Sequence, residues 1–438
     1  LISVLTGLYA NFNFGLREAG GWIVWSWSLV AAGQYLIARV MAALSVRFPI
    51  AGYGYQWTAR LVNPHFGFFV GWMLLAQFMT GFPGIAQTAA VTIASSAGIS
   101  AEPDTIIILT LFIISMVALI HLWGIRIASR INDAGVYTEL AGVALLILLL
   151  TWALISTGIF EPAAIITGIN QRTGTTPGWI SLAPSLLLGA WCLTGFEAAA
   201  DLAEETHAPE KTVPKAVVNA LISAAAAGFI ILILLIWAAG DIYEIQQASN
   251  PLGLILENAI GPTMAAVVNI FVIISILACA VASMATASRL LFSMARDRML
   301  PGSEWLAKVN PATKTPQGAT IAVWILSGLA VVVFRKIEVI TSVSALASFI
   351  GYAGIMYACV REGGGWLPAA ALVWSTAIVA ALALPETEVA GFSTRHLPAW
   401  SAAVVLAAGT LIYLTGVRKG IQSGKSGPPP IKNKTTDH

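Results

Sequence analysis

The sequence predicts an all-α integral membrane protein, and three observations lead to this fold class. The chain of 438 residues is 58% hydrophobic and only 10% charged, whereas soluble globular proteins carry about 25% charged residues. Its hydrophobic residues gather in stretches that are long enough to cross about 30 Å of hydrocarbon. Its basic residues concentrate at one of the two sets of stretch ends. Polar residues this scarce cannot cover the surface of a soluble protein.

Apolar stretches of spanning length occur in eleven places along the chain. They cover residues 22–45, 66–96, 104–123, 134–157, 182–199, 214–239, 264–290, 317–334, 338–360, 366–384 and 398–417. Residues 1–15 resemble the outer half of one more span, and the chain starts there with Leu rather than Met. We therefore expect twelve spans in the native protein, with the first span truncated here.

The positions of the 23 lysines and arginines orient these spans. When the spans are threaded alternately across a membrane, five basic residues fall on one side: Arg17, Arg172, Arg335, Lys336 and Arg395. All the others fall on the opposite side, which the positive-inside rule assigns to the cytoplasm. We expect a multi-pass protein of the plasma membrane with its N-terminus and C-terminus in the cytoplasm.

Two of the predicted spans are interrupted by glycine. Leu5-Thr6-Gly7-Leu8 interrupts the first, and Leu193-Thr194-Gly195-Phe196-Glu197 interrupts the span that opens the second half of the chain. Lipid tolerates a broken helix only where protein or a water-filled cavity covers the freed backbone groups. Interrupted helices in corresponding positions of two halves are the best sequence pointer to the site of an inverted-repeat transporter. The sequence therefore indicates a secondary transporter.

Three motifs give the chain a resemblance to a known family. They are Phe48-Pro49…Gly52-Tyr53-Gly54-Tyr55, Gly195-Phe196-Glu197…Glu204-Glu205-Thr206…Val213-Pro214-Lys215-Ala216, and Arg289…Ala295-Arg296-Asp297…Leu300-Pro301…Thr315-Pro316. In this order they resemble the amino acid/polyamine/organocation (APC) superfamily permeases, and most of all its amino acid–choline branch, with bacterial and fungal amino acid, GABA and choline permeases. The chain departs from that pattern at Ala43, where members often have Glu, and at Gly52-Tyr53, where Gly-Gly is expected.

The resemblance implies a leucine-transporter-like fold, with a 5+5 inverted repeat plus two C-terminal helices, and transport by alternating access. On this basis we divide the chain into four parts. Residues 1–157 form the first five-helix repeat with an incomplete first span, and residues 181–361 form the second. Residues 365–417 supply two additional spans, and residues 418–438, which are rich in Gly, Pro and Lys, are expected to be a disordered cytoplasmic tail.

Backbone groups at the two breaks form the candidate substrate site, which comprises Ser3, Thr6, Gly7, Thr194 and Gly195. The N-terminus of a half-helix carries unpaired N–H groups and a partial positive charge that stabilise a carboxylate. Carbonyl groups freed at a C-terminal end can accept hydrogen bonds from an ammonium group. The alternative is that these small residues only allow the helices to pack closely.

Two residues after the second break extend this site. The resemblance implies an aromatic side chain that stacks on the substrate in this region. Phe196 is the first candidate, and Trp191, about one turn earlier, is the second. The alternative is that Phe196 faces lipid or the core. Glu197 can bind a substrate ammonium group, carry a proton, or pair with a basic residue such as Arg39. The alternative for Glu197 is a structural ion pair or a position in a water-exposed vestibule. For Arg39 we favour a side chain that extends to the membrane surface.

Glu139 and Glu197 are the candidate proton-coupling residues. The resemblance implies that the fifth helix lies against the broken first helix, where an ionisable side chain can replace a bound sodium ion. Glu139 lies one or two turns into that fifth span, although it can equally snorkel to the surface beside Asp133. Ser283 and Thr286 are weak candidates for a sodium site, and a packing role is more plausible for both.

The remaining acids and the histidines carry no expected catalytic site. Asp201, Glu204 and Glu205 are expected at the cytoplasmic surface. The five histidines are scattered over loops and span ends, without metal-ligand spacing, and the sequence contains no phosphate-binding loop. We therefore expect no resident metal, no cofactor, no nucleic acid partner, and no enzymatic activity.

The sequence as a whole predicts a permease that moves a small amine across the plasma membrane. The expected substrates are an amino acid, GABA, choline or a polyamine, and the expected coupling is to protons or to a counter-substrate. A non-transporting amino acid sensor with the same fold is the first alternative, and a membrane-embedded transferase is the second. Uptake into vesicles separates the sensor from the transporter.

Overall fold

The computed structural model describes residues 3–158, 160–171, 174–178, 182–383, 388–389, 392–393 and 397–429. Its long helices are α1 (Val4–Ala19), α2 (Ile23–Arg47), α4 (Pro64–Ser96), α5 (Pro103–Trp123), α6 (Ile125–Thr157), α10 (Pro209–Ala238), α12 (Pro251–Arg296), α14 (Gln317–Phe334), α15 (Ile337–Arg361), α16 (Trp366–Ala383) and α17 (Leu397–Ile412). Its short helices are η1 (Gly20–Trp22), α3 (Tyr53–Leu61), η2 (Pro162–Ile166), η3 (Ala183–Ser185), α8 (Leu186–Cys192), α9 (Ala198–Asp201), η4 (Ala203–Glu205), α11 (Ile242–Gln247), α13 (Ser303–Leu306), the π-helical turn η5 (Tyr413–Val417) and α18 (Arg418–Gln422). Two short strands, β1 (Glu388–Val389) and β2 (Phe392–Ser393), pair antiparallel.

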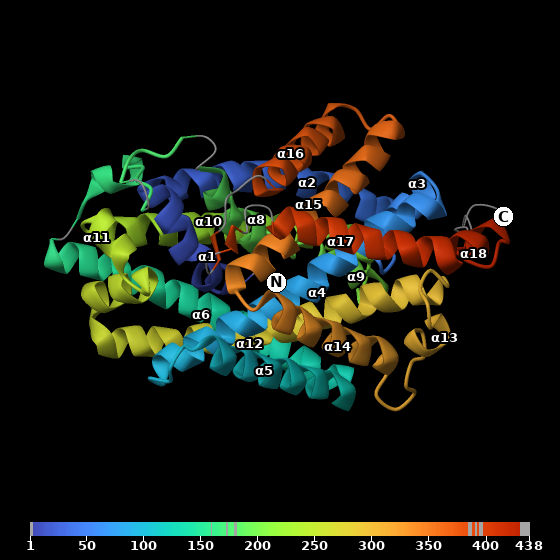
Figure 1. Ribbon diagram of the computed structural model, residues 1–438, viewed down its shortest axis with the longest axis horizontal. Helices are drawn as coiled ribbons and strands as arrows, with labels where there is room; N and C mark the ends of the chain where they lie inside the picture. Colours follow the sequence, from blue (N-terminus) through green and yellow to red (C-terminus); the bar gives the residue numbers. More distant parts are fainter. Residues whose placement is uncertain are drawn as a thin grey trace.

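The long helices run side by side and form an elongated bundle (Figure 1). The short helices α3, α13 and α18 lie at one end of this bundle, and α11 lies at the other end (Figure 1). Ten helical segments of the described chain are long and apolar enough, by length and composition, to cross a membrane. The prediction of an all-α, multi-pass membrane protein is confirmed.

The observed spans follow the predicted ones, with three main differences. Helix α6 begins at Ile125, nine residues before the predicted stretch 134–157. The stretch predicted at 182–199 is not one helix, because the apolar helix Ala183–Cys192 ends before the break. The stretch predicted at 264–290 belongs to α12, which begins at Pro251 and kinks at Gly261, where φ is 77°. The segment after α2, for which the sequence predicts a short interfacial element, is the nine-residue helix α3. The repeat boundaries at 157, 181 and 361 stay a prediction.

Large apolar side chains divide between the interior and the outer faces of the helices. Trp27, Trp57 and Phe12 are fully buried, whereas Phe112 on α5 and Leu148 on α6 are exposed. Exposed apolar side chains on spanning helices suit contact with lipid, which is as apolar as the core itself.

The expectation of a disordered tail from residue 418 is wrong for residues 418–429. Arg418–Gln422 forms α18, and the following residues fold back in turns that include Gly424, with φ of 69°. Hydrogen bonds to other parts of the chain, described below, hold this segment in place. Residues 430–438, and the predicted outer-side residues Arg172 and Arg395, lie outside the described residues.

Candidate substrate-binding site

The second predicted break is present between α8 and α9. Helix α8 ends at Cys192, and residues 193–197 leave the helical path before α9 begins at Ala198. Gly195 has φ of +95°, a conformation that side chains with a Cβ rarely adopt. A Cβ at Gly195 would meet no atom within 4 Å, so the backbone conformation, rather than space, requires glycine here.

The first predicted break is not present as an interruption, because Leu5-Thr6-Gly7-Leu8 lies within the continuous helix α1, whose first turns lie beside the end of α8. Helix α1 begins at Val4, with the Ser3 hydroxyl accepting a hydrogen bond of 3.2 Å from the Thr6 amide. A Cβ at Gly7 would lie only 2.0 Å from the Cys192 Sγ. Gly7 therefore lets the start of α1 approach the end of α8, as the close-packing alternative proposes. Gly7 also lies on the wall of the central cavity, so a role in helix packing and a role in the substrate site are compatible.

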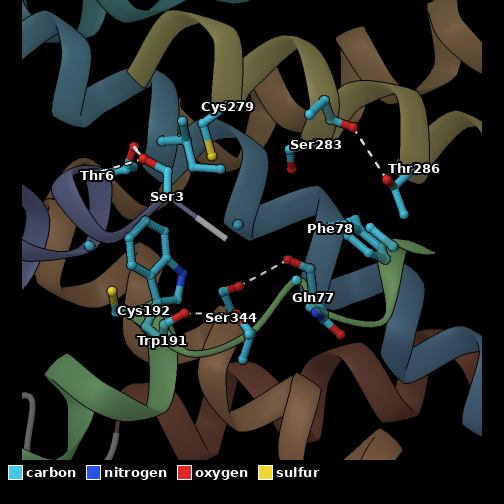
Figure 2. A pocket seen from close by; sticks show the side chains of 17 residues that line it. Ser3, Thr6, Gln77, Phe78, Trp191, Cys192, Cys279, Ser283, Thr286 and Ser344 are labelled. Carbon is cyan, nitrogen blue, oxygen red and sulfur yellow. Dashed lines mark hydrogen bonds between the residues drawn. The ribbon is translucent and has the colours of Figure 1, made fainter. Parts of the chain in front are cut away.

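A central cavity opens where α1, α4, α8, α12 and α15 converge, and Figure 2 shows it from close by. The structure brings together on its wall eight of the residues that the sequence analysis singled out. These residues are Ser3, Thr6, Gly7, Trp191, Thr194, Gly195, Ser283 and Thr286. Their role in substrate binding stays a prediction, but their convergence from three separate segments is a structural fact.

Phe196, the first aromatic candidate, does not line this cavity. Its side chain is 1% exposed, and its ring packs against the Tyr352 ring at a centroid distance of 6.1 Å. The aromatic residues on the cavity wall are Trp191 and Phe78. The turn after Gly195 directs residue 196 away from the cavity, whereas Trp191, on the last turn of α8, faces into it (Figure 2).

The sequence analysis missed the cavity residues that come from unbroken helices. Gln77, Phe78, Gly81 and Ile85 line the cavity from α4, and Ser344 lines it from α15. A glutamine within an apolar span is the one signal that would have pointed to α4. Cys192 and Cys279 also line the cavity, and the side chains on its wall carry no formal charge.

Glu197 lies behind the break and is fully buried. One carboxylate oxygen accepts a hydrogen bond of 2.9 Å from the Gly195 amide. The other accepts hydrogen bonds of 2.8 Å from Gln77 Nε2 and from the Tyr352 hydroxyl. Glu197 thus ties the broken helix to α4 and α15. Arg39 lies elsewhere, exposed on α2, where its guanidinium donates to the Tyr35 hydroxyl at 3.0 Å.

Glu139 on α6 is buried at the start of α1. Its carboxylate accepts hydrogen bonds from the Ser3 hydroxyl at 2.7 Å and from the Leu5 amide at 3.2 Å. The Ser275 hydroxyl of α12 donates to the same carboxylate. An acid at a helix N-terminus satisfies orphan amides and is stabilised by the helix dipole. The structure therefore places Glu139 against the first helix rather than at the surface beside Asp133.

Ser283 and Thr286 of α12 both line the cavity, but their geometry adds little to the sodium prediction. The Thr286 hydroxyl donates to the Ala282 carbonyl of its own helix at 3.2 Å. Among the described residues, three or more His, Cys, Asp or Glu side chains nowhere gather as they would around a metal ion. The sodium site stays a weak prediction.

A second, larger cavity adjoins the central one on the side of the basic helix ends. The two cavities share Ala198, Ala282 and Thr286 on their walls. The larger cavity is lined by several charged side chains: Arg126, Arg130, Asp133, Arg289 and Lys314. Within the described chain, Ala198, Ala282 and Thr286 thus lie between the central cavity and a polar vestibule at that end.

The chain matches known permeases over most of its length. Residues 1–362 match a family model described as amino acid permease. The amino-acid permease BAT1 of Arabidopsis thaliana is 24% identical over 390 residues, which cover 81% of this chain and 74% of that protein. The branched-chain amino acid permease BcaP of Bacillus subtilis is 22% identical over 363 residues, covering 79% and 75%. An uncharacterized amino-acid permease of Schizosaccharomyces pombe is 27% identical over 376 residues, covering 79% and 66%.

Proposed function

Because the chain belongs to the amino acid permease family, we propose that the central cavity binds an amino acid and that the protein carries it across the plasma membrane by alternating access. The protein is a multi-pass membrane transporter of this family and not an enzyme. The observation that supports the site most directly is the convergence of Ser3, Gly7, Thr194 and Gly195 on one cavity. Both termini are proposed to lie in the cytoplasm, on the side of most basic residues.

The neutral wall of the cavity favours a zwitterionic amino acid over choline or a polyamine. A net cation buried in protein needs a compensating acid. The nearest acids, Glu139 and Glu197, do not line the cavity and already accept several hydrogen bonds each. A zwitterion brings its own compensating charge. Its ammonium group suits the C-terminal end of α8, where the helix dipole is negative.

Glu139 is the proposed proton-coupling residue. In the carboxylate form it makes charge-assisted hydrogen bonds to Ser3 and to the Leu5 amide, and such bonds are about twice as strong as neutral ones. Protonation removes the charge that favours the α1 N-terminus and weakens this attachment. A proton taken up at Glu139 would thereby free α1, which places Ser3, Thr6 and Gly7 on the cavity wall, to move relative to α6. Exchange against a counter-substrate is the alternative form of coupling.

The test is uptake into proteoliposomes that contain the purified protein. Radiolabelled amino acids, GABA, choline and putrescine are presented with and without an inward proton gradient, and with and without internal substrate. Gradient-stimulated accumulation of an amino acid is the expected result. Uptake only against internal substrate would identify an exchanger. Ligand binding without any uptake would contradict transport and identify a sensor.

A further inference from the structure

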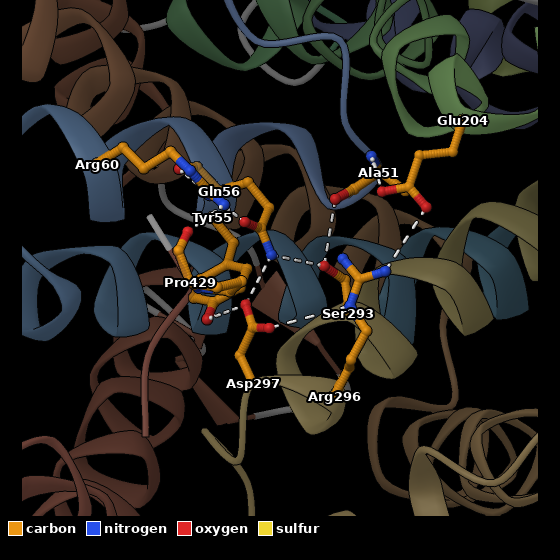
Figure 3. Close-up of polar contacts among 9 residues, drawn as sticks. All are labelled: Ala51, Tyr55, Gln56, Arg60, Glu204, Ser293, Arg296, Asp297 and Pro429. Carbon is orange, nitrogen blue, oxygen red and sulfur yellow. Dashed lines mark hydrogen bonds and ion pairs between the residues drawn. The ribbon is translucent and has the colours of Figure 1, made fainter. Parts of the chain in front are cut away.

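Four segments that are far apart in the sequence meet at the end of the molecule near α3 (Figure 3). They are residues 51–60, the turn η4 that follows α9, the C-terminal end of α12, and the tail residues 423–429. The substrate cavity does not use this junction, yet hydrogen bonds connect all four segments. Its arrangement explains why the tail is ordered.

Asp297, which caps the C-terminus of α12, is the centre of the junction. Its buried carboxylate accepts hydrogen bonds from the Tyr55 hydroxyl at 2.9 Å and from Gln56 Nε2 at 2.7 Å. Burial and the Asp297 charge raise the pKa of Tyr55 far above its usual range, so the phenol remains a donor. Two consecutive residues of α3 therefore hold the end of α12 through one side chain.

The tail residues bind the backbone carbonyl groups of the turn that follows α12. The Gly427 amide donates to the Asp297 carbonyl at 2.9 Å, and the Ser426 hydroxyl donates to the Arg298 carbonyl at 2.9 Å. The Arg60 guanidinium, at the end of α3, donates to the Pro429 carbonyl at 3.2 Å. The contacts thus form a closed ring that runs from α3 through the α12 turn and the tail back to α3.

The start of α3 is in turn attached to the inner half of the broken helix. The Gly52 amide donates to the buried carboxylate of Asp201, the last residue of α9, at 2.7 Å. The Ala51 amide donates to Glu204 Oε1 at 3.1 Å, and the other Glu204 oxygen lies 3.5 Å from the Arg296 guanidinium. The sequence analysis expected Asp201 at the surface, and the structure corrects this, since Asp201 is only 1% exposed.

We propose that residues 423–429 form a strap that restrains the transport cycle by fixing α3 to the end of α12. The proposal rests on the proposed function in one respect, namely that the inner half-helix moves during transport. While the strap is bound, α3 cannot follow Asp201 and Glu204, so their contacts with Gly52 and Ala51 must break before the half-helix moves. Once the strap detaches, only Tyr55 and Gln56 hold α3 to Asp297, so α3 moves more readily with the half-helix and the cycle becomes faster.

Three substitutions on the strap separate this role from a passive tail. Gly427→Pro removes the amide that binds Asp297 and demands φ near −65°, whereas Gly427 has φ of +118°. Ser426→Ala removes only the hydrogen bond to Arg298. Lys425→Ala is the matched control, because it leaves both of these contacts intact. All three positions lie beyond the last helix, and the nearest neighbour of a new side chain at Gly427 is Pro64 at the very start of α4, 3.3 Å from the added Cβ.

The first readout is independent of transport. Hydrogen exchange of the amides at residues 51–57 and 295–300 is measured in the full chain and in each variant. Gly427→Pro is expected to speed exchange at both segments tenfold or more, Ser426→Ala less, and Lys425→Ala not at all. Unchanged exchange in Gly427→Pro would overturn the strap, whether or not the protein transports any substrate tested.

The second readout is the initial rate of substrate uptake into proteoliposomes. Gly427→Pro is expected to raise this rate at least twofold over the parent protein, with Lys425→Ala at the parent rate. Faster amide exchange together with an unchanged or lower uptake rate would mean that the tail binds without restraining transport, and would overturn the proposal. Failure of every variant and of the parent to take up substrate would count against the proposed function, while the exchange data would still decide whether the strap exists.

Discussion

The Glu139 carboxylate of α6 accepts a hydrogen bond of 2.7 Å from the hydroxyl of Ser3, which lies 136 positions earlier in the chain. This contact joins the start of the first helix to the fifth predicted span. In the sequence Glu139 is an isolated acid. The contact with Ser3 makes Glu139 a specific candidate for proton coupling, because any change in its charge acts directly on α1.

Glu139→Gln should remove the proton dependence of uptake. The amide has nearly the same shape but cannot gain or lose a proton in the working pH range. We expect an inward proton gradient to stimulate the parent protein several-fold and the variant not at all, as measured by initial uptake rates. Glu102→Gln, at an exposed position before α5, is the control and should retain the stimulation. A variant still stimulated by the gradient would exclude Glu139 as the coupling residue.

Glu197→Gln should destabilise the protein more than it alters its pH dependence. The Glu197 carboxylate accepts hydrogen bonds from three donors: the Gly195 amide, Gln77 Nε2 and the Tyr352 hydroxyl. A glutamine offers only one oxygen, so at least one buried donor loses its acceptor, at a cost of about 1–3 kcal/mol. A lower thermal unfolding midpoint in detergent is expected, while Glu257→Gln, at an exposed site on α12, should leave it unchanged. An unaltered midpoint in Glu197→Gln would contradict this structural role.

Gly7→Ala should separate α1 from α8, since the new Cβ would lie 2.0 Å from the Cys192 Sγ. Overpacking of this kind costs about 1–3 kcal/mol, and it shifts one wall of the cavity. We expect uptake to fall at least tenfold. Gly416→Ala is a matched control, because Gly416 ends another Leu-Thr-Gly sequence and a Cβ there meets no atom within 4 Å. Equal losses of activity in the two variants would refute the packing argument.

The aromatic residues near the break should have separable effects. Trp191→Phe trims a side chain on the cavity wall and is expected to raise KM for the transported amino acid. Phe196→Leu trims a fully buried side chain away from the cavity, so it should lower the thermal midpoint with little change in KM. Parallel measurement of KM and the midpoint tests both statements. A larger rise in KM for Phe196→Leu would restore Phe196 as the residue that covers the substrate.

Gly81→Ala should make uptake more selective for small substrates. Gly81 lines the cavity, and a Cβ there would lie 2.8 Å from the Oγ of Ser344, which lines the cavity beside it. We expect KM to rise more for leucine than for alanine. Adding Ser344→Ala removes the crowded oxygen and should recover part of the leucine uptake. Equal effects on both substrates would show that this side of the cavity does not contact the substrate side chain.

The sequence by itself determined the membrane class, the approximate spans and the position of the break at Gly195, whereas the interruption it predicted at Leu5–Leu8 is part of the continuous helix α1. These properties are local, since hydrophobic length decides whether a segment can span a membrane, and Gly195 marks its break through the φ of +95° that it must adopt. Ser3, Gly7 and Thr194 were therefore found as cavity residues without any knowledge of the fold. Their position at or beside the two Leu-Thr-Gly sequences was sufficient.

Only the tertiary structure decided which side chains face the cavity. Phe196 and Trp191 are five positions apart, yet only Trp191 lines it, because the turn between them sets the direction of each side chain. Gln77 and Ser344 belong to unbroken helices and gain their place from the packing of α4 against α15. The tail was misjudged for the same reason. Its composition suggests disorder, whereas its order depends on hydrogen bonds to Asp297 and Arg298, more than a hundred positions away.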